Sequence, residues 1–99
     1  MTGTTRSSQG LDARRRKLLY HCWHRGTREM DLIMGRFADA AIGDLNEADV
    51  DDFERLAEVP DQDLYGWLTG NAPLKADYDT EVFRRLRAFV ERKEGRSGK

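Results

Sequence analysis

Residues 30–41 of this 99-residue chain have the sequence Met-Asp-Leu-Ile-Met-Gly-Arg-Phe-Ala-Asp-Ala-Ala, and this stretch decides the fold. Its apolar residues recur at intervals of three and four, as on one buried helix face: Met30, Ile33, Met34, Phe37, Ala38 and Ala41. Gly43 follows shortly afterwards and is placed to end the helix. Gly35 lies inside it, where glycine costs about 1 kcal/mol relative to alanine. We therefore expect a central helix in which Gly35 marks the close approach of a neighbouring helix.

The rest of the chain repeats this helical spacing, and no stretch alternates apolar and polar residues over the length of a strand. Four further helices are predicted at about residues 11–24, 47–57, 60–69 and 80–93. The connections are short, which favours packing of each helix against its predecessor. A chain of this length supports only one core. The predicted fold class is all-α, a small five-helix bundle in a single domain.

Polar residues and glycines at the ends of these segments indicate where the helices and the domain begin and end. Side chains that suit N-caps precede three helices: Thr27, Asn46, and either Asp79 or Thr80. Gly26 and Gly70 suit left-handed positions after the first and fourth helices. We assign residues 11–93 to the helical domain and expect disordered tails at residues 1–10 and 94–99.

The net charge is only −1, but the charges are distributed unevenly. Residues 1–30 contain seven basic and two acidic side chains, residues 31–81 three and fourteen, and residues 82–99 seven and two. We expect the basic terminal helices to lie beside the acidic middle. The basic run Arg14–Lys17 leaves one alternative open, a small helical nucleic-acid-binding or transcriptional accessory domain, although the acidic middle would repel phosphate.

Composition also bears on compartment and on metal chemistry. No stretch approaches the roughly 20 apolar residues that cross a bilayer, and the first ten residues do not resemble a secretion signal. Cys22 is the single cysteine, so no internal disulfide forms, and a soluble protein in a reducing compartment is expected. His21 and His24 lie near Cys22, but no third surface ligand is evident, so we predict no metal site.

A short charged segment joins the first two predicted helices. Glycine suits the bend, and threonine and glutamate suit the start of the next helix, but these roles leave two arginines unexplained. We interpret the segment as a rigid polar cluster that projects outward and pairs with charges of a partner. The candidate residues are Arg25, Gly26, Arg28, Glu29 and Asp31.

Two motifs carry a resemblance to a known family. The first is Arg-Gly-x-x-Glu followed by Met-Asp-Leu and a helix containing Gly-Arg-Phe, from Arg25 to Phe37. The second is Glu-Val-Pro-Asp-Gln-Asp-Leu-Tyr-Gly-Trp-Leu-Thr-Gly, from Glu58 to Gly70. At this separation the pair closely resembles the succinate dehydrogenase assembly factor family, small proteins that promote covalent attachment of FAD to the flavoprotein subunit. The similarity covers about residues 11–90.

The resemblance implies a chaperone-like assembly factor that is not an enzyme. It implies no catalytic residue, no metal and no cofactor of its own, because the FAD belongs to the client protein. The expected partner is the flavoprotein subunit of succinate dehydrogenase, respiratory complex II, and in many bacteria that of fumarate reductase. Carried over by position, the partner-binding residues are Arg25, Gly26 and Glu29, with Arg28 and Asp31 adjoining.

The same resemblance implies a protein that is monomeric when free and that neither binds nucleic acid nor inserts into a membrane. It would be cytoplasmic in a bacterium, or in the mitochondrial matrix if the source is eukaryotic. One enzymatic alternative remains open, in which His24 and Glu29 act as acid and base across a pocket between them. Tyr65 and Trp67 are predicted to be core or core-edge aromatics.

Overall fold

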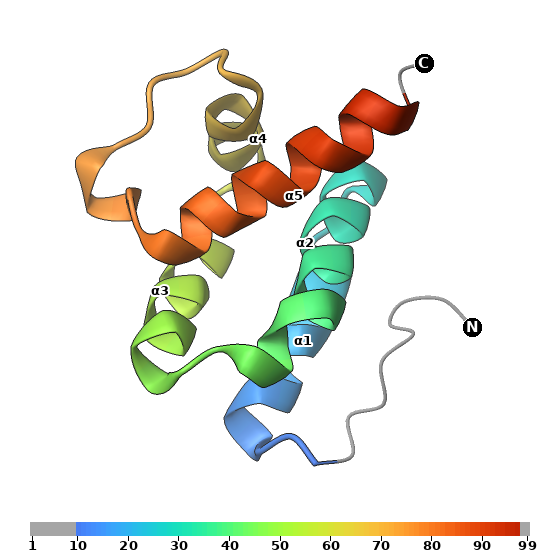
Figure 1. The fold of residues 1–99 in the computed structure, drawn as a ribbon, viewed down its shortest axis with the longest axis vertical. Coiled ribbons are helices and arrows are strands. Elements are labelled where there is room, and N and C mark those ends of the chain that lie inside the picture. The colour runs from blue at the N-terminus through green and yellow to red at the C-terminus, as the bar shows by residue number, and fades with distance from the viewer. Residues whose placement is uncertain (1–9, 98–99) are drawn as a thin grey trace.

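The computed structural model describes residues 10–97, with side chains described for residues 10–92 (Figure 1). The elements are α1 (Ala13–Trp23), α2 (Arg28–Ala41), α3 (Glu47–Ala57), α4 (Asp61–Thr69) and α5 (Glu81–Ser97), with 3-10 turns η1 (Ile42–Asp44) and η2 (Ala76–Tyr78). The described part of the chain contains no strand, which confirms the predicted all-α, five-helix fold.

The ends of the domain differ in part from those expected. The tail predicted at residues 1–10 lies outside the described residues except for Gly10, which forms a turn. The tail predicted at residues 94–99 overlaps the end of α5, which continues past Lys93 to Ser97, and residues 98 and 99 lie outside the described residues. Glu91, Arg92, Lys93 and Glu94 are good helix formers, so the backbone continues as a helix after the apolar pattern has ended.

The predicted N-caps form as expected. Thr27 Oγ1 accepts a hydrogen bond from the Met30 N–H, and Asn46 Oδ1 accepts one from the Asp49 N–H. At α5 the hydroxyl of Thr80 accepts from the Phe83 N–H, which decides between the two expected caps. Each bond satisfies a donor that the first turn of a helix leaves without an intrahelical partner.

The helices do not simply pack one after another. α1 and α2 form an antiparallel hairpin, as expected, but α3 packs mainly against α1 and α5, and α5 crosses both α2 and α3 (Figure 1). The expectation that each helix packs against its predecessor is therefore wrong beyond the first pair. The connection through η1 leads the chain away from α2 to α3, and α4 lies at the same end of the molecule as the start of α2 (Figure 1).

The core confirms α2 as the central helix. The ring of Phe37 makes edge contacts with Phe53 of α3 at 5.5 Å and with Phe89 of α5 at 5.7 Å between centroids. One side chain of α2 therefore joins three helices. Among residues 10–97 no helix has the length and apolar content needed to span a bilayer.

Gly35 lies directly beneath a side chain of α1, which confirms the close approach of a neighbouring helix that the sequence predicts there. A Cβ atom at this position would overlap the indole ring of Trp23, far inside van der Waals contact. The indole therefore lies directly on the backbone of α2, and its Nε1 donates to Asp39 at 3.3 Å. This contact fixes the end of α1, from which the charged segment follows.

Candidate functional site

The α1–α2 corner consists of residues 24–27, between the last residue of α1 and the first of α2. His24 closes α1 with a φ of −132° and a ψ of 55°, outside the helical region, and Gly26 has a φ of +113°, which L-residues rarely adopt. Thr27 then caps α2. Gly26 thus has the positive φ predicted for it, two residues beyond the C-cap of α1.

Arg25 does not project outward as predicted. Its side chain is only 7% exposed, and its Nε donates to Asp61 Oδ1 at 2.6 Å. The two terminal nitrogens donate to the backbone carbonyls of Ala57 and Val59, each at 2.6 Å. The guanidinium therefore binds the segment between α3 and α4, because these carbonyls lie at a helix end with no intrahelical donor left for them.

Asp31 also turns inward, contrary to the prediction. Its carboxylate accepts a hydrogen bond from the backbone N–H of Arg25 and is half-buried. This bond joins the first turn of α2 to the corner that precedes it. Arg25 and Asp31 are thus internal supports of the corner rather than parts of its outer surface.

The remaining predicted residues stay on the surface. Gly26, Arg28 and Glu29 are exposed, and a Cβ at Gly26 would meet no atom within 4 Å. No basic side chain within residues 10–92 forms an ion pair with Glu29. Two of the five predicted site residues, Arg25 and Asp31, therefore point inward. The other three remain exposed: Gly26, Arg28 and Glu29.

The α2–α4 groove opens beside the corner. It has a volume of about 440 Å³ and is lined by Thr27, Glu29, Met30, Asp61, Gln62 and Tyr65. Tyr65 is 41% exposed, so its predicted core-edge position is wrong, whereas Trp67 is buried as predicted. The sequence contained a signal for this, since Tyr65 lies off the stripe formed by the buried residues of α4: Leu64, Trp67 and Leu68.

The groove joins the two motifs that carried the family resemblance. Asp61 belongs to the second motif and its Oδ2 accepts from the Thr27 hydroxyl at 3.3 Å, while its Oδ1 holds Arg25. From the sequence, Asp61 is expected only as an acidic residue in the first turn of α4, and neither Asp61 nor Gln62 is predicted to belong to the site. Local pattern alone could not have placed them beside a corner more than thirty residues earlier.

A second groove lies on the other side of the Arg25–Asp61 pair. It measures about 330 Å³, and its lining includes His21, His24 and Glu58. The ring of His24 stacks on Tyr20 at 3.9 Å, and its Nδ1 lies 2.8 Å from the Tyr20 carbonyl oxygen. His24 lines this second groove and Glu29 lines the α2–α4 groove, so neither of these two grooves brings the pair together as the acid–base hypothesis requires.

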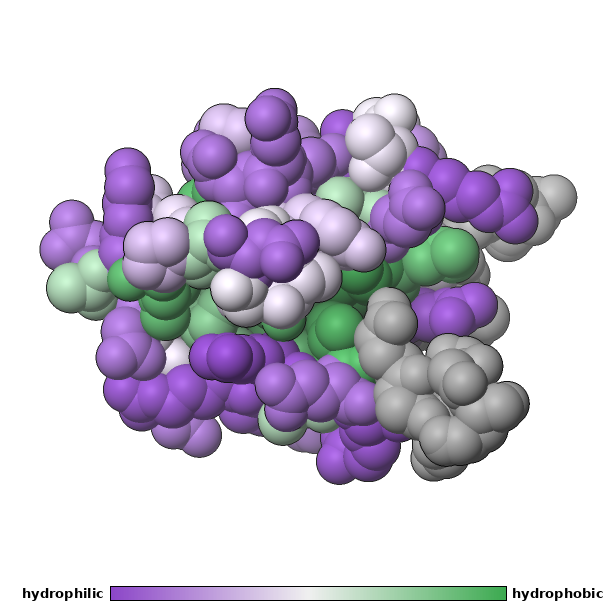
Figure 2. Space-filling model, turned by 90° about the horizontal axis from the view of Figure 1, so that it is seen from above, coloured by the Kyte–Doolittle hydropathy of each residue, from purple (hydrophilic) through white to green (hydrophobic). Residues whose placement is uncertain are grey.

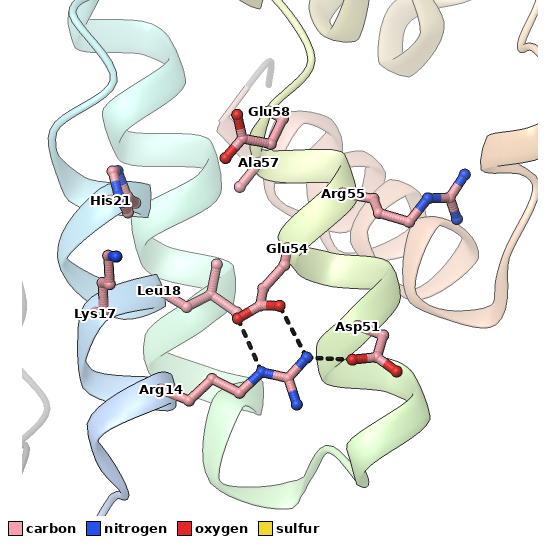
Figure 3. A pocket seen from close by; sticks show the side chains of 9 residues that line it. All are labelled: Arg14, Lys17, Leu18, His21, Asp51, Glu54, Arg55, Ala57 and Glu58. Atoms are coloured by element: carbon pink, nitrogen blue, oxygen red, sulfur yellow. Dashed lines mark hydrogen bonds and ion pairs between the residues drawn. The ribbon is translucent and has the colours of Figure 1, made fainter.

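Arg14, at the start of the basic run on α1, pairs with acidic side chains of α3 (Figure 3). Arg14 donates from Nε to Glu54 at 2.9 Å and also pairs with Asp51 and Glu47. These bonds lower the pKa of Glu54 and raise that of Arg14. This confirms the expected pairing of a basic terminal helix with the acidic middle, and it leaves Arg14 occupied rather than free for phosphate.

The face that carries α4 and the start of α2 is shown from above in Figure 2. Apolar residues reach the surface in a central band, and hydrophilic side chains surround it.

Cys22 is fully buried, and burial raises the pKa of its thiol to about 12. The thiol is therefore protonated at neutral pH and is not part of this surface.

Comparison with known proteins agrees with the motifs. Residues 16–90 match the family described as Sdh5, flavinator of succinate dehydrogenase. The FAD assembly factor SdhE of Acetobacter pasteurianus is 36% identical over 80 residues, which cover 81% of this chain and 73% of that protein. The mitochondrial succinate dehydrogenase assembly factor 2 of Dictyostelium discoideum is 35% identical over 74 residues, which cover 75% of this chain and 52% of that protein.

A second mitochondrial relative, succinate dehydrogenase assembly factor 2 of Scheffersomyces stipitis, is 36% identical over 66 residues, 67% of this chain and 44% of that protein. The chain thus spans about half the length of these two mitochondrial proteins. The match to the family covers most of the helical domain, from within α1 to within α5. The chain therefore belongs to the family of flavinators of succinate dehydrogenase.

Proposed function

We propose that this protein binds the flavoprotein subunit of succinate dehydrogenase and promotes covalent attachment of FAD to it. The observation that carries the proposal is the α1–α2 corner. Arg25, Asp31 and Asp61 hold its backbone in place, and Gly26, Arg28 and Glu29 remain exposed on it. Family membership supplies the client and the reaction.

The proposed mode of action is binding without turnover by this chain. Covalent attachment requires that the reacting atoms of the client and its flavin lie within attack distance. A partner that binds one conformation of the client more tightly than the others raises the population of that conformation. A rigid corner suits this task, because it loses little conformational entropy when it binds. The flavoprotein of fumarate reductase is a second client under the same proposal.

The test is co-expression of the flavoprotein subunit with and without this protein in cells that lack other family members. Covalent flavin is measured by fluorescence of the denatured flavoprotein in a gel, and complex formation by co-purification. We expect more covalent flavin and a co-purified complex when the protein is present. Equal flavin in both samples would contradict the proposed function.

The corner is tested with Gly26→Arg, which places a bulky side chain on the exposed backbone. Gly70→Arg is a matched control, because Gly70 also has a positive φ, of +83°, and a Cβ there also meets no atom within 4 Å. Both variants bear backbone strain of about 1–3 kcal/mol. We expect only Gly26→Arg to lose the complex; equal binding by both variants would remove the corner from the interface.

A further inference from the structure

The α2–α4 groove has an unequal charge balance. Of its six lining residues, Glu29 and Asp61 are acidic and none is basic. The charge of Asp61 is offset by Arg25, and both of its carboxylate oxygens accept hydrogen bonds. Glu29 is exposed, and no counter-charge within residues 10–92 pairs with it. One carboxylate of the groove is therefore available to a cation from outside.

An aromatic side chain lines the same groove. Tyr65 is 41% exposed, although large aromatic side chains are usually more deeply buried. A tyrosine ring attracts a cation above its face, and guanidinium groups are favoured because they also stack on it. Met30 is buried and contributes apolar surface to the lining. The groove thus combines a carboxylate and an aromatic ring beside a buried methionine.

We propose that the α2–α4 groove receives an arginine side chain of the client flavoprotein, with its guanidinium between Glu29 and Tyr65. Arginine fits better than lysine, because a planar guanidinium pairs with a carboxylate through two N–H groups while it stacks on a ring. The inference rests on the proposed function for the client's identity. It adds the α4 side of the groove to an interface that the Arg-Gly-x-x-Glu motif alone would confine to the corner.

The first test measures the dissociation constant for the purified full chain and the purified flavoprotein subunit of succinate dehydrogenase. Glu29→Gln should weaken binding about tenfold, the effect of losing a charge-assisted hydrogen bond. Tyr65→Leu should weaken it about two- to fivefold, whereas Tyr65→Phe, which keeps the ring, should bind like the wild type. The double variant should lose less than the product of the two effects, because both act on one guanidinium.

Controls separate this arginine contact from general effects of charge. Asp44→Asn removes an exposed carboxylate from η1, beyond the far end of α2, and should leave binding unchanged. Wild-type affinity in Glu29→Gln or in Tyr65→Leu would overturn the proposal, and so would fully multiplicative effects in the double variant. Circular dichroism of each variant checks that the helices are retained.

The second test identifies the occupant. Benzoylphenylalanine placed at position 65 is photo-crosslinked to the flavoprotein, and the crosslinked peptide is identified by mass spectrometry. We expect the crosslinked flavoprotein peptide to contain an arginine. Replacement of that arginine by glutamine should weaken the binding of the flavoprotein to the wild-type protein, but should not weaken its binding to the Glu29→Gln variant further. A crosslinked surface without arginine would overturn the proposal. If the wild-type protein neither binds the flavoprotein nor raises its covalent flavin, the proposed function fails. If the wild-type protein does bind and does raise covalent flavin, but the groove variants bind as tightly as the wild type, only the groove proposal fails.

Discussion

At the scale of single residues, Arg25 makes the most extensive set of contacts in the candidate site. Its guanidinium donates hydrogen bonds to one carboxylate and two backbone carbonyls, all from the end of α3 or the start of α4. Loss of this side chain would leave these acceptors without their donor in a half-buried place. A functional defect in an Arg25 variant would therefore reflect a displaced corner and not a lost contact with the client.

Arg25→Ala should lower the free energy of unfolding by about 2–3 kcal/mol, because three half-buried acceptors lose this donor. Arg25→Lys should recover little of this, since one ammonium group cannot replace the three-way guanidinium contact. Urea denaturation followed by circular dichroism measures both. Arg28→Ala is the control, because this exposed neighbour should change stability by no more than about 0.5 kcal/mol. Equal stability of the Arg25 and Arg28 variants would refute the supporting role of Arg25.

Gly35→Ala should destabilise the protein although alanine favours helices. The added methyl group would overlap the indole of Trp23, and we expect a net loss of about 1–3 kcal/mol from overpacking. In a Trp23→Ala background the overlap is absent, so the same substitution should become neutral or stabilise by up to about 1 kcal/mol. Denaturation midpoints of the wild type, the two single variants and the double variant measure this coupling. An equal loss of stability from Gly35→Ala with and without Trp23 would contradict it.

At the scale of helices, the contact between α1 and α3 depends on pH. The hydrogen bond from Arg14 lowers the pKa of Glu54 below its ordinary value of 4.5. A carboxylate whose pKa is lower in the folded state stabilises the fold above the unfolded pKa, and this stabilisation disappears as the pH falls through the folded value. Arg14 thus contributes to stability at neutral pH and less in acid.

Arg14→Gln should therefore have a lower melting temperature than the wild type at pH 7, and the difference should shrink below about pH 4.5. Melting curves followed by circular dichroism between pH 3 and pH 7 measure it. Arg36→Gln is a suitable control, since Arg36 is exposed on α2 and is not among the groups that shift the pKa of Glu54. A difference between Arg14→Gln and wild type that stays constant over this range would contradict the assigned role of the ion pair.

The helices themselves could be predicted from the sequence because their signals are local. Periodicity gave the buried face of α2, and Thr27 and Asn46 cap the helices that they precede. The close approach at Gly35 was also predicted correctly, since a glycine inside a helix needs a reason. The packing of α3 against α1 and α5 could not be predicted in this way, because helix–helix contacts depend on which faces meet in space.

At the scale of the whole molecule, the buried thiol of Cys22 reports on unfolding. Its pKa is raised to about 12 by burial, and none of its surface is exposed. We expect Ellman's reagent to modify the native protein at least about 1,000-fold more slowly than the urea-unfolded chain, since a domain of this size is stable by about 5 kcal/mol or more. Rapid labelling of a protein with native circular dichroism would show that α1 opens locally.

The candidate site could be predicted only in part. The sequence identified the corner and its exposed residues, but it assigned Arg25 and Asp31 to the outer surface. An arginine in a charged segment gives no local sign that its partners are Asp61 and two carbonyls near the end of α3. Tyr65 was assigned to the core edge for a similar reason, since an aromatic residue is usually buried and only the spacing within α4 indicated otherwise.

The bond between Arg25 and Asp61 has a consequence for synthesis of the protein on the ribosome. The Arg-Gly-x-x-Glu segment emerges early, but the residues that give it its shape come from α3 and α4. A nascent or truncated chain that ends before Asp61 would contain all residues of the Arg-Gly-x-x-Glu motif, but it would lack the contacts that fix their conformation. Recognition of the client by this segment is thus expected only after residues 57–61 have been synthesised and have folded against it.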